Sequence, residues 1–183
     1  MTNLTTKNMV TIALMTSVMC IVAPFSIPLP FTPVPISLTN LVIYISSCIL
    51  GCKKGTISVL LYLLIGAIGL PVFSGFSGGF TRIAGPTGGY LVGFIFCAVF
   101  TGIFVEKFED KAYTYSVGMS IGTAICYVFG TVWLAFQMNI TFIQALLMGV
   151  VPYLLWDGLK IAVSTLLGYK FRIRLKSMDL IIE

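Results

Sequence analysis

The chain has 183 residues, of which 58% are hydrophobic and 9% charged, with a formal net charge of +5 and a mean hydropathy of +1.04. Soluble domains carry about a quarter of charged residues, so this composition excludes an ordinary soluble protein and indicates an integral membrane protein. Lipid leaves exposed backbone without hydrogen-bond partners, and the apolar runs are too long and too little alternating for barrel strands. The sequence therefore predicts an all-α bundle in one domain, residues 1–183.

Six apolar segments approach the length of about 20 residues that crosses a bilayer. They run roughly from Met9 to Ala23, Ile36 to Leu50, Gly55 to Leu70, Gly88 to Val105, Ala112 to Phe136, and Val151 to Gly168. A signal peptide is an alternative for the first segment, but no small-residue cleavage site follows it, and we interpret it as a membrane helix. Five prolines in residues 24–35 predict an extended turn between the first two segments.

The apolar stretch from Phe142 to Gly149 either begins the sixth span or forms a separate short helix at the outer surface. Pro152 suits the first turn of a new helix, and Gly149 suits the end of the helix before it. The pattern favours a separate helix.

The basic residues are distributed in a way that orients the chain. Nine of the eleven lie at the ends of the predicted helices, in both termini and in alternate connections: Lys7, Lys53, Lys54, Lys107, Lys111, Lys170, Arg172, Arg174 and Lys176. Under the positive-inside rule both termini are predicted to be cytoplasmic, which six spans satisfy. This reading accounts for the net charge without a nucleic-acid partner. The chain has no histidine, and its five cysteines are interpreted as packing residues rather than metal ligands.

The sixth predicted span contains two ionisable residues, Asp157 and Lys160. Their spacing, with that of Tyr153 and Ser164, places four polar side chains on one helix face. An ionisable residue at membrane depth is costly and marks a functional site by default. The alternative is an internal ion pair that only fixes helix packing.

The connection formed by residues 72–90 contains six glycines in nineteen residues, which lets its backbone approach a ligand closely. Its one charge, Arg82, either is solvated at the headgroup level or binds a carboxylate. A flexible surface turn is the simpler alternative. The chain has no Walker motif, so an ATPase that drives transport would be another chain.

Small residues recur four apart at Gly85, Gly89 and Gly93, and again at Gly118 and Gly122. This spacing is typical of close helix packing in membranes. Tyr90 and Tyr153, at helix ends beside the polar cluster, are predicted to turn hydroxyls into a cavity.

Three stretches of the chain resemble one family. They are the run from Tyr62 to Phe73, the string Gly85-Pro86-Thr87-Gly88-Gly89-Tyr90-Leu91-Val92-Gly93-Phe94, and Asp157-Gly158-Leu159-Lys160. Together they resemble the BioY family, the biotin-specific substrate-binding subunits (S-components) of energy-coupling factor vitamin importers. The resemblance implies a six-helix cell-membrane protein that is not an enzyme and that needs no cofactor. It also implies a vitamin pocket near the outer face, closed by the loop between the third and fourth helices, and a transmembrane scaffold subunit with two ATPase subunits as partners.

The resemblance and the chemistry of biotin together suggest contacts. Asp157 can accept from a ureido N–H, and Lys160 can either donate to the ureido oxygen or neutralise the carboxylate, so that Arg82 or loop N–H groups take the remaining end. The candidate substrate-binding residues are Asp157, Lys160, Arg82, Tyr90, Gly85, Thr87, Gly89, Trp156, Tyr153 and Asn40. Tyr90 and Trp156 would cover the apolar ring. The small residues Ala13 and Ser17, four apart on the first helix, are candidates for docking on the scaffold subunit.

Two other functions are weighed against biotin capture. One is an S-component for another vitamin or small solute. The other is a membrane-embedded enzyme with Asp157 as general base, which is disfavoured because the fourth and fifth spans supply mostly glycine, serine and threonine. The fifth span is accordingly expected to be a scaffold distant from the site.

Overall fold

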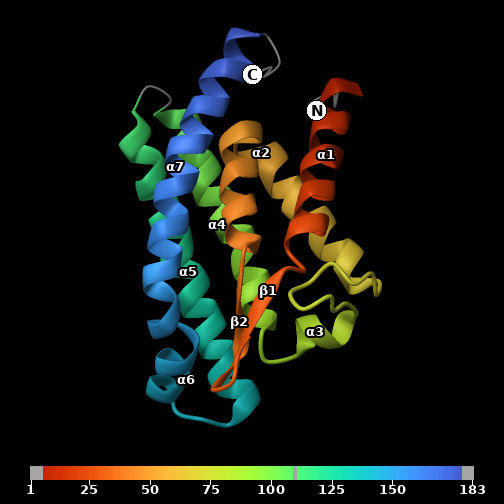
Figure 1. The fold of residues 1–183 in the computed structure, drawn as a ribbon, viewed down its shortest axis with the longest axis vertical. Coiled ribbons are helices and arrows are strands. Elements are labelled where there is room, and N and C mark those ends of the chain that lie inside the picture. Colours follow the sequence, from red (N-terminus) through yellow and green to blue (C-terminus); the bar gives the residue numbers. More distant parts are fainter. Residues whose placement is uncertain (1–5, 109–110, 179–183) are drawn as a thin grey trace.

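The computed structural model describes residues 6–108 and 111–178. Long helices run side by side, with the first and last described residues at one end and a β-hairpin and short helices at the other (Figure 1). The long elements are α1 (Thr6–Val22), α2 (Thr39–Ala67), α4 (Gly88–Lys107), α5 (Ala112–Met138) and α7 (Leu154–Ser177). The short ones are β1 (Ser26–Leu29), β2 (Thr32–Ser37), α3 (Phe80–Ala84), α6 (Phe142–Gly149) and the 3-10 turn η1 (Val151–Tyr153).

The helices confirm a membrane protein of mostly helical structure. Within the described ranges, α2, α4, α5 and the stretch from Phe142 to Ser177 are long and apolar enough to cross a bilayer, and α1 is a shorter apolar helix of 17 residues. Each of the six predicted segments contains a helix, although the second begins within β2, which ends at Ser37. The predicted separate helix before Pro152 is also confirmed as α6, and α7 continues to Ser177 rather than ending at Gly168.

The second and third predicted segments are the two halves of α2, which reverses direction at Gly51 (Figure 1). Gly51 has φ 77°, a conformation that glycine adopts without steric cost. The carboxylate of Glu106 accepts a hydrogen bond from the Cys52 N–H at 2.9 Å, and the Arg172 guanidinium donates to the Cys48 carbonyl at 3.0 Å. A negative group therefore faces the start of one half and a positive group the end of the other, as helix dipoles favour.

The prediction of an all-α structure is wrong between α1 and α2. The proline-rich stretch forms an antiparallel hairpin in which Ser26 pairs with Ser37 and Leu29 with Thr32, with an irregularity between these pairs. In a two-stranded sheet each strand has a free edge, and proline, which lacks an N–H, is tolerated there. The hairpin lies at the end of the bundle that also carries α3 and α6 (Figure 1).

Glycines bring α4 and α5 into close contact, as their spacing predicts. A Cβ atom on Gly93 would lie 2.6 Å from Cys126 Sγ, and one on Gly122 would lie 2.8 Å from Cys97 Cα. Carbon atoms do not approach this closely, so larger side chains would force the two helices apart. The structural role of these glycines is confirmed.

Gly89→Val is expected to destabilise the protein by about 1 to 3 kcal/mol, the usual cost of overpacking a close contact. A Cβ at this position would lie 2.4 Å from Trp133 Cβ and 2.8 Å from the Phe129 carbonyl oxygen. The matched control is Gly158→Ala in α7, where nothing lies within 4 Å of an added Cβ. Thermal unfolding in detergent gives the Tm of each variant. We expect a lower Tm for Gly89→Val than for the wild type, and an unchanged or higher Tm for Gly158→Ala. Equal Tm values would contradict the close approach of α4 to α5.

Candidate functional site

A buried polar cluster joins α7 to the first half of α2. Asp157 and Lys160, each less than a tenth exposed, form an ion pair with Nζ 2.9 Å from Oδ1. Asn40 completes a triangle, because its Nδ2 donates to Asp157 Oδ1 at 2.8 Å and its Oδ1 accepts from Lys160 Nζ at 3.0 Å. Each charge therefore has a partner of opposite sign and a neutral hydrogen-bonding partner, which is what burial of charge requires.

A fourth member of the cluster comes from α5. The Tyr127 hydroxyl donates to Asp157 Oδ2 at 2.5 Å. The expectation that this helix would be distant scaffold is wrong, since α5 contacts α7 and carries the donor to the second carboxylate oxygen. A tyrosine in the middle of an apolar run was the available sequence signal, because buried hydroxyls need a partner.

The predicted polar face of α7 is confirmed. Tyr153, Asp157, Lys160 and Ser164 are all buried. Tyr153 donates its hydroxyl hydrogen to the Val34 carbonyl of β2, and Ser164 Oγ lies 3.5 Å from the Leu41 carbonyl of α2. This face is therefore directed at the hairpin and α2 rather than at lipid.

Two adjoining cavities lie between this cluster and the hairpin, and we call the one at the cluster the lower chamber and the one at the hairpin the upper chamber. The lower chamber, of about 60 Å³, is lined by the four cluster residues and by Tyr44, Tyr90, Phe94 and Tyr153. The upper chamber, of about 250 Å³, is lined by the hairpin, by the loop before α3, and by Arg82, Thr87, Tyr90 and Phe94. The two chambers share Val34, Pro35, Ser37, Tyr90 and Phe94 as walls.

The glycine-rich loop closes one side of the upper chamber by contacts to two other segments. The Gly75 N–H donates to the Pro24 carbonyl at 2.9 Å, and the Phe76 ring meets the Phe25 ring edge-on at 5.3 Å. Further along, the Gly79 N–H donates to the Gly66 carbonyl at 2.7 Å. The loop thus lies against the hairpin end of α1 and the end of α2.

The structure brings some predicted site residues to the cavity and leaves others outside it. Asn40, Arg82, Thr87, Tyr90, Tyr153, Asp157 and Lys160 line one chamber or both. Gly85 and Gly89 line neither chamber and instead contact Trp133 of α5. Trp156 is 49% exposed and lines a separate apolar groove of about 580 Å³ between the hairpin and α7. A covering role for Trp156 would therefore require it to act from outside the two chambers.

The two candidate docking residues lie on the outer face of α1. Ala13 and Ser17 are exposed, and the Ser17 hydroxyl donates back to the Ala13 carbonyl at 2.9 Å. The opposite face of the helix is buried and carries Thr16, whose Oγ1 lies 3.0 Å from Ser58 Oγ of α2. Hydrogen bonds to α2 on one side leave the small residues on the other side open to a partner.

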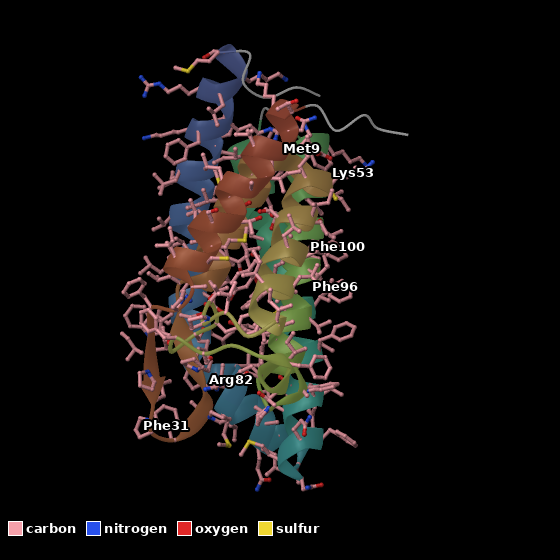
Figure 2. All side chains as sticks on the ribbon, turned by 90° about the vertical axis from the view of Figure 1, so that its right-hand side faces the viewer. Met9, Phe31, Lys53, Arg82, Phe96 and Phe100 are labelled. Atoms are coloured by element: carbon pink, nitrogen blue, oxygen red, sulfur yellow. The ribbon has the colours of Figure 1, made fainter. Side chains whose placement is uncertain are left out.

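The site combines three chemical features along its depth. Its base offers a carboxylate acceptor, an ammonium donor and an amide, its middle is lined by Tyr90 and Phe94, and its mouth carries the Arg82 guanidinium. In the side view, Arg82 lies toward the hairpin end and Lys53 toward the opposite end (Figure 2). This order fits a ligand with a neutral polar head, an apolar body and an anionic tail.

Comparison with known proteins identifies the family. The family model described as "BioY family" matches residues 1–177. The chain is 39% identical to a biotin transporter BioY of Thermotoga maritima over 84% of this chain and 87% of the relative, and 37% identical to one of Rhizobium etli over 78% and 80%. A crystal structure of the S-component for biotin from an ECF-type ABC transporter superposes with a TM-score of 0.85 at 31% identity, covering 94% of both chains. This chain therefore belongs to the BioY family.

Proposed function

We propose that this protein is the biotin-binding S-component of an ECF-type importer and that it captures biotin in the two-chamber cavity. The observation that carries the proposal is the buried cluster of Asp157, Lys160, Asn40 and Tyr127 at the base of that cavity. Ionisable residues at membrane depth are costly and rare, and by default they mark a functional site.

The lower chamber suits the ureido ring of biotin. This ring has two N–H donors and one carbonyl acceptor, and the Asp157 carboxylate accepts while Lys160 donates. Charge-assisted hydrogen bonds of this kind are stronger than those between neutral groups. The ammonium already lies 2.9 Å from the carboxylate, so the two groups present an acceptor and a donor side by side.

Arg82 at the upper chamber suits the carboxylate of biotin. A carboxylate at the base would face the negative charge of Asp157, whereas at the mouth it meets a cation with a planar donor fork. The apolar ring and alkyl chain would then lie between these ends, against Tyr90 and Phe94.

The ends of the bundle differ in charge, which supports an orientation with both termini in the cytoplasm. Lys7 is close to the first described residue and the basic last turn of α7 is close to the last one. Lys53 lies at this same end of the bundle, while Arg82 lies toward the hairpin end (Figure 2). Positive residues are retained on the cytoplasmic side. The cavity would then open outward, where it can collect the vitamin.

A scaffold subunit and two ATPase subunits would supply the energy for uptake. The chain has no phosphate-binding loop of its own, which supports a separate ATPase. The small residues Ala13 and Ser17 on the outer face of α1 would allow a helix of the scaffold subunit to approach closely.

Isothermal titration of the purified protein tests the proposed ligand. We expect biotin to bind with one site per chain, and riboflavin and thiamine to give no heat of binding, because neither presents a ureido head with a carboxylate tail. Binding of riboflavin or thiamine in place of biotin would assign the protein to another vitamin. No binding of any of the three would contradict the proposal.

Bound biotin is expected to slow amide hydrogen exchange in residues 74–87. A ligand shifts a conformational equilibrium toward the state to which it binds more tightly, and the loop forms one side of the upper chamber only when it lies against Pro24 and Phe25. Exchange measured by mass spectrometry with and without biotin gives the comparison, and residues 6–22 of α1 are the internal control. Equal protection in both samples would mean that the loop is a rigid wall rather than a gate.

A further inference from the structure

Two side chains of α5 hold the far end of the glycine-rich loop. The indole Nε1 of Trp133 donates to the Gly85 carbonyl at 2.8 Å, and the Gln137 amide donates to the Ala84 carbonyl. These two carbonyls end α3, where carbonyls lack partners within the helix, and the Gly85 carbonyl also accepts from the Gly88 N–H at 3.0 Å. Trp133 and Gln137 are four residues apart and so lie on the same face of α5.

These bonds matter because α3 has little packing of its own. The helix has five residues, and none of them is fully buried, although Ile83 touches the edge of the core. Just before its first turn, the Gly79 N–H donates to the Gly66 carbonyl and so connects the start of α3 to α2. An isolated helix this short is not stable in water, so contacts to the rest of the protein must hold it in place.

The glycine pair that follows the loop makes room for the indole of Trp133. A Cβ on Gly88 would lie 3.2 Å from Trp133 Nε1, and one on Gly89 would lie 2.4 Å from Trp133 Cβ. Side chains at these positions would push the indole away from the Gly85 carbonyl. The string Gly85-Pro86-Thr87-Gly88-Gly89 therefore supplies both the acceptor and the space for one donor of α5.

We propose that Trp133 and Gln137 are positioning residues that hold α3 so that Arg82 stays at the upper chamber. Arg82 is the third residue of α3, and a turn of this helix about its axis would swing the guanidinium out of the cavity mouth. The inference rests on the proposed function, in which Arg82 binds the biotin carboxylate. Neither α5 residue lines a chamber, so each would act only through α3.

The test compares biotin with its neutral methyl ester, titrated into the wild type, Trp133→Phe, Gln137→Met and the variant with both changes. Phenylalanine keeps an aromatic ring at the membrane interface but lacks the N–H, which separates positioning from interfacial anchoring. We expect the wild type to prefer biotin over the ester by about tenfold, the usual value of a charge-assisted hydrogen bond. Arg82→Gln should abolish this preference. The double variant should lower it at least threefold, roughly the effect of losing one hydrogen bond, while its affinity for the ester stays unchanged.

Two further measurements make the result decisive. In the Arg82→Gln background, Trp133→Phe should not change the ratio of the two affinities, since the residue through which it acts is gone. Phe136→Leu, at an exposed position of the same helix, is the matched control and should behave as the wild type. An unchanged ratio in the double variant, or an equal loss of affinity for both ligands, would overturn the inference. If the double variant does not fold, Gln137→Met alone, at an exposed position, must lower the ratio of the affinity for biotin to that for the ester. If the wild type binds no biotin, the proposed function fails first and the inference with it.

Discussion

Asp157→Asn is expected to weaken biotin binding by about 1 to 3 kcal/mol, roughly a five- to 150-fold rise in Kd. Asparagine keeps the size of the side chain and one carbonyl oxygen, but it lacks the negative charge that accepts from the ureido N–H. The change also leaves Lys160 buried with only neutral partners, because its other contact is the Asn40 carbonyl at 3.0 Å. Breaking a buried ion pair is destabilising in itself, so the Tm without ligand should fall as well.

Titration calorimetry gives the Kd, and size-exclusion chromatography with a thermal melt establishes that the variant is folded. Ser164→Ala is the matched control, since this residue lies on the same buried face of α7 but lines neither chamber. The control should bind biotin as the wild type does. An unchanged Kd in a folded Asp157→Asn variant would mean that the Asp157 carboxylate does not contact biotin.

Ala13→Trp and Ser17→Trp are each expected to abolish biotin uptake in cells that contain the partner subunits while leaving biotin binding unchanged. Both residues are exposed on α1, and the Thr16 side of that helix is the one bonded to α2. An indole at either position would keep a partner helix from approaching closely, and it could not reach either chamber. Uptake of radiolabelled biotin and titration of the purified variants give the two readouts.

Val128→Trp provides the control for the bulk of the indole. This residue is 59% exposed on α5, and placing a large ring there should affect neither uptake nor binding. Normal uptake by both α1 variants would place the docking face on another helix. Loss of binding in either of them would mean that α1 contributes to the site.

The fold could be predicted where composition and periodicity act locally. Long apolar runs must be helical in lipid, so the six helical segments and the separate α6 followed from the chain alone. The hairpin did not, because a proline-rich stretch is compatible with any extended structure until a second strand pairs with it. The reversal within α2 was predicted as a break between two spans, and the tertiary structure adds the contacts of Glu106 and Arg172 beside Gly51.

The sequence by itself determined the class of the protein, the buried face of α7 and the ion pair of Asp157 with Lys160, because residues three and four apart meet on any helix. Only the tertiary structure decided which distant residues complete the cluster. Tyr127 reaches Asp157 because the packing of α5 brings it to α7, whereas Trp156, adjacent to Asp157 in the chain, points into a separate groove. Neighbours along a helix diverge by about 100° around its axis. Contacts between helices depend on packing that no local pattern records.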